Sequence, residues 1–254
     1  MLGMGMAESQ SVEELRCALA KSEKKYAELE ASINARAHEI AKAEFQAEMT
    51  RISSELAHDL RGPLQIITNS LFLMERKPGD TTYYPKIGDA LKQATGILDA
   101  FREYYRGHEI MLMKGNVNRI IEKSIEDVTV PNGIVVSKNL DPAVPDTMLD
   151  LGKVKRNIAV LLKNAVEAMP NGGNLSVSSC VDGGTILVRI SDTGSGIPEA
   201  IRSKVFIAFG AKKRGGYGLA LAATKRNLEA MGGSISFETE SGKGTTFTIS
   251  LPIK

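Results

Sequence analysis

The most restrictive feature of this sequence is a stripe of apolar or small side chains that recurs every three or four residues from Val12 to Ala43. Such alternating steps place these side chains along one narrow side of a helix. The stripe is too narrow to face a globular core and suits a two-stranded coiled coil, although Ser22 and Arg36 weaken it. Its members are Val12, Leu15, Leu19, Ser22, Tyr26, Leu29, Ile33, Arg36, Ile40 and Ala43.

Beyond this stripe the same spacing continues on a displaced register. The displaced set consists of Phe45, Met49, Ile52 and Leu56. A phase change of this kind is a stutter, at which the packing of a supercoil locally unwinds. The helical region is therefore either a plain dimerisation stalk or a helix that transmits a signal.

Two long amphipathic stretches flank a strong turn signal, Lys-Pro-Gly-Asp at 77–80. The first stretch continues towards Met74, and two such helices joined by a short turn form an αα-hairpin. A lone hairpin cannot bury both apolar sides, so we expect a homodimer in which two hairpins form a four-helix bundle. The apolar side of the second stretch consists of Ile87, Leu91, Ala94, Ile97, Leu98, Phe101 and Tyr105.

After residue 107 the pattern changes to alternating helices and strands. Helices are expected near 117–128, 151–169 and 217–231, and strands near 134–139, 174–181, 185–191, 234–240 and 245–251. Runs such as LSVSS and ILVRIS alternate in polarity, as strands with one covered face do. The pattern predicts a multi-domain chain: a coiled-coil helix at 1–45, a helical hairpin at 46–108, and an α+β sandwich at 109–254 with helices on one face of a mixed sheet.

Composition excludes several classes of function. The formal net charge of +2 is too small to make nucleic acid or an anionic membrane the main partner. Cys17 and Cys180 have no CxxC spacing, which argues against a disulfide framework or a zinc site and favours a reducing compartment. No apolar run approaches the roughly 20 residues that cross a bilayer, and the first ten residues do not resemble a signal peptide. We therefore expect a cytoplasmic chain without membrane contact.

Four patches in the α+β region occur together and in order. Each is weak alone, because a helical Asn, a DxGxG turn and a Gly-rich loop are commonly structural. They are LLKNAVEAM with Asn164, DTGSGI with Asp192, GGYGLAL with Gly216 and Gly218, and GKGTTF with Gly242 and Gly244. In this combination residues 116–254 resemble the ATP-binding fold shared by histidine kinases, gyrase, the Hsp90 chaperones and MutL.

The resemblance gives each patch a chemical role. The neutral amide oxygen of Asn164 suits a hard Mg2+ ion that bridges ATP phosphates. The carboxylate of Asp192, at a strand end, can accept a hydrogen bond from the adenine amino group, and Gly194 and Gly196 let the backbone approach the base. The other expected ATP-binding residues are Ile197, Phe209, Lys212, Lys213, Arg214, Gly216, Gly218, Leu219 and Thr245.

Two parts of this set, the Gly-rich patch and the basic triplet, are expected to bind the phosphates of ATP. Gly216 and Gly218 precede Leu219 at the start of a helix, where free amides and the helix dipole favour anions. The basic triplet 212–214 can meet the triphosphate or can be a solvated loop, and Phe206 and Phe209 can anchor the segment that carries it.

The hairpin contains SSELAHDLRGPLQIITNSL, in which His58 is followed at once by Asp59 and then by Pro63. This segment resembles the phosphoacceptor box of histidine kinases. The resemblance implies that His58 takes the γ-phosphate of Mg-ATP and passes it to an aspartate in a separate response-regulator receiver domain. Asp59 can fix the tautomer of the ring or take its proton, and Pro63 is expected to bend the helix.

Three positions depart from patterns common in this fold family and leave alternatives open. Val160 stands where gyrase-like and chaperone ATPases have a Glu that activates water, which argues against hydrolysis as the main activity. Glu167 stands where many kinases have a Lys, and Gly62 where many have the Thr or Asn linked to the phosphatase step. The alternatives are a dimeric phosphotransfer scaffold or degenerate kinase that binds ATP weakly, and a gyrase-like or chaperone-like ATPase.

Overall fold

The computed structural model describes residues 3–77, 79–106, 110–211 and 217–253 of the 254-residue chain. These residues form two compact units, Met1–Glu55 and Leu56–Lys254. The order of elements is helical up to residue 106 and mixed helix and strand beyond it. The predicted fold class is thereby confirmed for the single chain.

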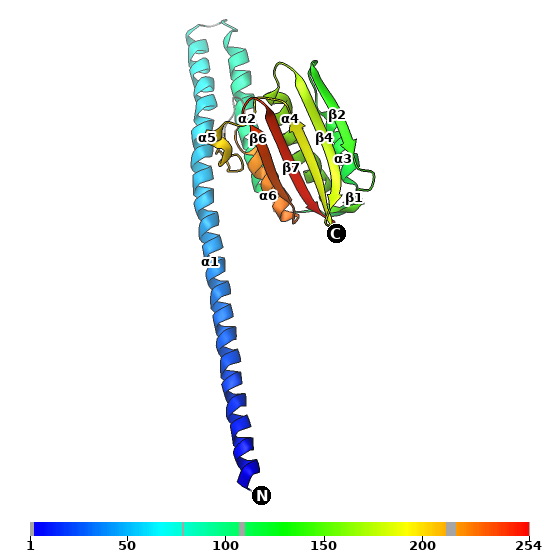
Figure 1. Cartoon of the computed structure of the whole chain (residues 1–254). Helices are drawn as coiled ribbons and strands as arrows, with labels where there is room; N and C mark the ends of the chain where they lie inside the picture. The colour runs from blue at the N-terminus through cyan, green and yellow to red at the C-terminus, as the bar shows by residue number, and fades with distance from the viewer. Residues whose placement is uncertain (1–2, 78, 107–109, 212–216, 254) are drawn as a thin grey trace. The chain divides into compact units, whose positions relative to one another are not determined.

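The first unit lies within one long helix, α1 (Gly3–Arg76), which continues into the second unit (Figure 1). Side chains of the predicted coiled-coil stripe are uncovered in the single chain, with Tyr26 71% and Ile33 58% exposed. In the part of the chain that the structure describes, no helix combines the length and the apolarity that crossing a membrane requires.

A helical hairpin begins the second unit. The last part of α1 ends at Arg76, and α2 (Tyr83–Arg106) follows after a short turn (Figure 1). In this turn the Oδ1 atom of Asp80 accepts hydrogen bonds from the hydroxyl and the backbone amide of Thr82, at 2.6 and 3.0 Å. These hydrogen bonds lower the pKa of Asp80. Pro78 of the predicted turn lies outside the described residues, and Pro63 lies inside α1, which remains helical around it.

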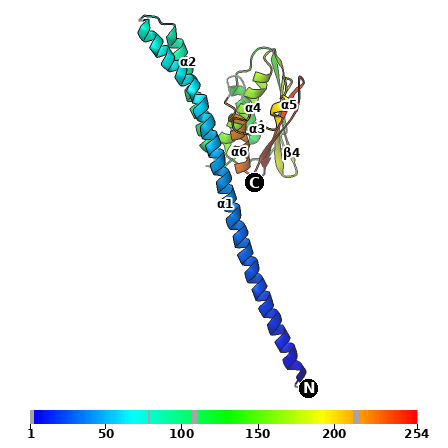
Figure 2. The same ribbon diagram turned by 90° about the vertical axis from the view of Figure 1, so that its left-hand side faces the viewer.

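The remainder of this unit contains a five-stranded sheet with the strand order β2-β4-β5-β7-β6. Only β2 and β4 pair in parallel, so the sheet is mixed, as predicted. The strands are β2 (Ile134–Leu140), β4 (Gly173–Asp182), β5 (Thr185–Asp192), β6 (Ser234–Glu240) and β7 (Gly244–Pro252). The helices α3 (Val117–Asp127), α4 (Leu151–Ala168) and α6 (Ala220–Ala230) cover one face of it (Figure 2).

Alternating side chains explain why one face of the sheet is covered. On β5, Ile186, Val188 and Ile190 are at most 1% exposed and face the helices, since successive side chains of a strand point to opposite faces. Ile158 and Leu161 of α4 are fully buried in the same core cluster. The opposite face of β2 carries Val135, which is 65% exposed.

Three short elements were not predicted. The strands β1 (Met113–Gly115) and β3 (Thr147–Leu149) form a separate antiparallel pair, and α5 (Glu199–Arg202) is a single turn. Elements of three or four residues are too short to display a period, so the pattern could not reveal them.

The start of one predicted helix was wrong. The helix expected from residue 217 begins at Ala220. Gly218 has φ +70°, a left-handed conformation that cannot belong to an α-helix, and Leu219 takes the N-cap position.

The core analysis predicts that Ile158→Ala lowers the free energy of unfolding by about 2–5 kcal/mol, because a fully buried side chain is removed and leaves a cavity. The exposed Val135→Ala is the matched control, for which we expect a change of about 0.5 kcal/mol. Urea unfolding followed by circular dichroism measures both, and equal losses in the two variants would contradict the assignment of the core.

Candidate functional site

The candidate site is centred on Asp192, the last residue of β5. Its side chain is buried, and its Oδ1 atom accepts a hydrogen bond from the Gly194 amide at 2.9 Å. Across the strand pair, Asp192 lies opposite Thr245, which is 5% exposed. The strand β7 starts at Gly244, where an added Cβ would overlap the Asp192 carbonyl group. A buried carboxylate is thus held at the end of β5, where the neighbouring strand β7 leaves no room for a side chain at Gly244.

The loop after Asp192 packs tightly on its neighbours. An added Cβ at Gly194 would lie 2.5 Å from the Ala168 carbonyl oxygen, and one at Gly196 would overlap the Glu240 carbonyl. The amide of Ser195 donates to the Ala168 carbonyl at 3.1 Å. Close packing on α4 and on the β6–β7 turn is therefore a sufficient reason for both glycines, and their approach to a base stays a prediction.

Thr239 connects several of the predicted residues. Its hydroxyl accepts a hydrogen bond from the Ile197 amide at 2.9 Å and donates one to the Gly244 carbonyl at 3.0 Å. It also lies 3.0 Å from the hydroxyl of Thr245. The sequence did not single out Thr239, because threonine is common in strands and gives no signal of its own.

Asn164 lies on α4, one helical turn before Ala168. Residues four positions apart share one side of a helix, so the half-buried amide lies on the side of α4 that contacts the loop after Asp192. Val160 is half-buried one turn earlier, and the exposed Glu167 lies 3.9 Å from the Lys163 Nζ atom. The structure thus brings Asn164, Asp192, Gly194 and Thr245 to one region.

Phe209 and Gly218, on either side of the basic triplet in the sequence, are joined by a backbone hydrogen bond. The Phe209 amide donates to the Gly218 carbonyl at 2.9 Å, and Phe209 itself is buried with φ +61°. The ring of Phe206 packs edge-on against Phe237 and Phe247, with centroids 5.7 and 6.5 Å away. Leu219, which follows Gly218, is buried. Lys212, Lys213, Arg214 and Gly216 lie outside the described residues.

His58 lies on the hairpin with a side chain that is 76% exposed. Its Nδ1 atom is 3.3 Å from Oδ1 of Asp59, whose side chain is 16% exposed. A carboxylate on Nδ1 favours the tautomer that leaves the Nε2 lone pair available. The exposed ring of His58 therefore has a nitrogen, Nε2, that can act as a nucleophile.

Polar contacts join α2 to the sheet domain within the second unit. The Tyr217 hydroxyl donates to the Gln93 carbonyl at 3.0 Å, beside Gly96. Arg156 forms an ion pair with Glu103, and the Arg226 guanidinium lies 5.1 Å from the centroid of the Tyr104 ring. The sequence did not predict these contacts, because their members are far apart along the chain.

A family model matches residues 150–254, and its description is "Histidine kinase-, DNA gyrase B-, and HSP90-like ATPase". Sporulation kinase E of Bacillus subtilis is 27% identical over 209 residues, which cover 80% of this chain and 28% of that protein. Sensor histidine kinase ZraS of Escherichia coli is 24% identical over 85% of this chain and 48% of that protein. The chain therefore spans half or less of the length of these curated relatives.

Solved structures share the fold at low sequence identity. The histidine kinase AdeS of Acinetobacter baumannii superimposes with a TM-score of 0.62 at 20% identity, over 78% of this chain and 98% of that one. The histidine kinase ThkA, solved in complex with the response regulator TrrA, gives a TM-score of 0.65 at 19% identity, over 80% of this chain and 61% of that one.

The crowding at β7 predicts that Gly244→Ala destabilises the domain by more than about 2 kcal/mol, because the new methyl group would overlap the Asp192 backbone at a positive φ. Gly242→Ala is the matched control in the same turn. It also has a positive φ but no atom within 4 Å of its Cβ position, so we expect a loss of about 1 kcal/mol. Urea unfolding measures the free energy of unfolding of both variants. An equal loss in the two would show that close packing against Asp192 is not the reason for the glycine at position 244.

Proposed function

Since the chain belongs to the sensor histidine kinases and carries an ATP-binding domain of the histidine kinase, gyrase B and Hsp90 type, we propose that it is an ATP-dependent histidine autokinase. The phosphate acceptor is His58, and the phosphate then passes to an aspartate of a separate response regulator. The observation that carries this proposal is the exposed His58 ring with the Asp59 carboxylate on its Nδ1 side, in the same chain as the ATP-binding domain.

The proposed transfer needs positioning and charge neutralisation more than covalent assistance. The Nε2 lone pair of His58 forms a bond to the γ-phosphorus of ATP, and the bond between this phosphorus and the bridging oxygen breaks to release ADP. Asp59 accepts the hydrogen bond of Nδ1–H and stabilises the positive charge that develops on the ring. The phosphorus–nitrogen bond formed in this way remains reactive enough for transfer to a carboxylate.

The proposed ATP site is the corner around Asp192. A buried acceptor at a strand end suits the adenine amino group, and the amide of Asn164 suits Mg2+. Among the described residues no group of three or more His, Cys, Asp or Glu side chains can hold a metal. A Mg2+ ion at Asn164 would therefore take most of its oxygen ligands from phosphates and water, as this ion commonly does. It would supply charge neutralisation at the phosphates.

Two partners belong to the proposal. Apolar side chains on the hairpin, including Leu64, Phe72 and Leu91, are half or more exposed in the single chain, which supports a second copy as the partner of the hairpin. A receiver domain is supported by the structure of ThkA with its response regulator. For the second unit, a homodimer that presents His58 to such a domain is the arrangement that we propose.

One observation favours an alternative. Val160 and Glu167 on α4 depart from the polar and basic side chains that the resemblance to this fold family implies at these positions, and Glu167 lies 3.9 Å from Lys163. The chain would then be a phosphotransfer scaffold or a degenerate kinase that binds ATP weakly. Calorimetric titration with an ATP analogue, with and without Mg2+, separates the two, because a scaffold would show no saturable binding.

The autokinase proposal predicts that label from γ-phosphate ATP appears on the chain, survives base and is lost in acid. His58→Gln should reduce this label to background, because the amide nitrogen of Gln is not nucleophilic. His38→Gln is the matched control and should label like the unchanged chain. Normal labelling of His58→Gln would exclude His58 as the acceptor.

The nucleotide proposal predicts that Asp192→Asn weakens binding of a non-hydrolysable ATP analogue about 10- to 100-fold, since a hydrogen bond to a charged acceptor contributes about 1.5–3 kcal/mol. An Asn side chain retains an oxygen for the Gly194 amide, so the loop should keep its conformation. Asp182→Asn, at the far end of β4, removes the same charge from an exposed position and should leave the affinity unchanged. Calorimetry measures all three proteins, and unchanged affinity in Asp192→Asn would remove Asp192 from the site.

A further inference from the structure

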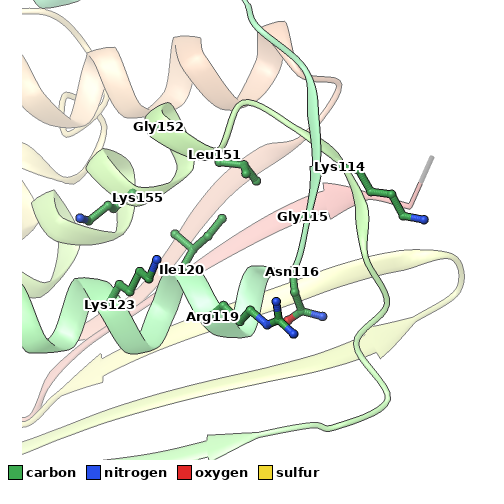
Figure 3. A pocket seen from close by; sticks show the side chains of 9 residues that line it. All are labelled: Lys114, Gly115, Asn116, Arg119, Ile120, Lys123, Leu151, Gly152 and Lys155. Atoms are coloured by element: carbon green, nitrogen blue, oxygen red, sulfur yellow. The ribbon is translucent and has the colours of Figure 1, made fainter.

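A concave site lies between α3, the start of α4 and β1 (Figure 3). Its cavity measures about 420 Å³, which is within the range of small-molecule sites. Figure 3 shows Arg119 and Lys123 on one side of α3 with Ile120 between them, and Leu151 on the facing element. The lining combines basic and apolar side chains.

The charged side chains that line this cavity all have the same sign. Four cationic side chains and no carboxylate line it: Lys114, Arg119, Lys123 and Lys155. Lys155 pairs with Asp127 at 2.6 Å, whereas the ion pairs found among the described residues include none of the other three. Arg119 and Lys123 are four positions apart on α3, a spacing at which like charges repel. A bound anion would relieve this repulsion.

The floor of the cavity is apolar. Ile120 is 8% exposed, and Leu151 packs against the Gly115 backbone so closely that an added Cβ there would lie 2.6 Å from its Cδ2 atom. Because Gly115 has no side chain, the backbone of β1 can pack directly against Leu151. A ligand that fills this cavity would place an apolar body on Ile120 and Leu151 and its charged group beside Arg119 and Lys123.

The position of the cavity separates it from the proposed nucleotide site. Lys155 and Leu151 precede Asn164 by 9 and 13 positions on the same helix, α4. At a rise of about 1.5 Å per residue these positions are roughly 14 and 20 Å from Asn164 along the helix axis. Lys155 and Leu151, which α4 contributes to the cavity, are thus on a different part of this helix from the amide that we assign to Mg2+.

We propose that this cavity binds a small phosphate ester, with the phosphate on Arg119 and Lys123 and the organic part on Ile120 and Leu151. A phosphate group carries up to two negative charges and three acceptor oxygens, which suits two separate cations better than a single carboxylate does. The concave shape and the volume favour a small molecule over a protein surface.

The test is calorimetric titration of the full chain with phenyl phosphate and with inorganic phosphate, without added nucleotide, because ADP is itself a phosphate ester and would compete for the cavity; dependence of binding on Arg119 and Lys123 separates this cavity from the proposed nucleotide site. We expect phenyl phosphate to bind saturably with one site per chain and more tightly than inorganic phosphate. Arg119→Gln/Lys123→Gln should weaken it about tenfold or more, since each lost charge–phosphate hydrogen bond contributes to affinity. Arg119→Lys/Lys123→Arg should bind within about threefold of the unchanged chain, because both positive charges are kept and Lys also binds phosphate, as a point charge.

The matched control is Lys92→Gln/Lys138→Gln, which removes two positive charges from exposed positions on α2 and β2 and should bind normally. Circular dichroism establishes that each variant is folded. No saturable binding of phenyl phosphate, equal affinity for inorganic phosphate, or an equal loss in the control pair would each overturn the proposal. Binding of an oligoglutamate peptide that depends on Arg119 and Lys123, without binding of phenyl phosphate, would overturn it in favour of an acidic protein partner.

Discussion

The close approach of the Gly244 backbone to the Asp192 carbonyl is the constraint on which the candidate site depends. No side chain fits between the end of β5 and the start of β7, so the two strands can meet there only through glycine. This contact sets Thr245 opposite Asp192 and places the β6–β7 turn against the loop after Asp192. The carboxylate is therefore positioned by the backbone of the sheet, and a rigid element holds it better than a loop would.

The sequence predicted the parts of the fold whose periodicity extends over several residues. In β5 polar and apolar residues alternate, and in α4 apolar residues recur at helical spacing. Both patterns are long enough to predict the type of element and the side of it that is buried. The start of α6 could not be predicted, because only the backbone reveals that Gly218 is left-handed. The cavity beside Arg119 also escaped prediction, since its lining comes from three elements and only the spacing of Arg119 and Lys123 is visible locally.

The candidate site was predictable for a related reason. Asn164 and Asp192 occur in short patches that keep their order, so residues far apart could be assigned to one region before any fold was known. Thr239 does not belong to any of these patches. The hydrogen bonds of its hydroxyl to Ile197 and Gly244 depend on the register of the strands, which the sequence does not reveal. Sequence patterns thus located the chemical groups but not the hydrogen bonds that support them.

The hydroxyl of Tyr217 reaches α2 beside Gly96, at a position where an added methyl carbon would lie 2.7 Å from its oxygen. Gln93 and Tyr217 are 124 positions apart, yet Tyr217 immediately precedes Gly218 of the Gly-rich patch. The ring of Tyr217 therefore links the surface of α2 to the chain next to Gly218. A larger side chain at residue 96 would have to displace that ring, so the choice of residue in the hairpin constrains the position of an aromatic side chain far downstream in the sequence.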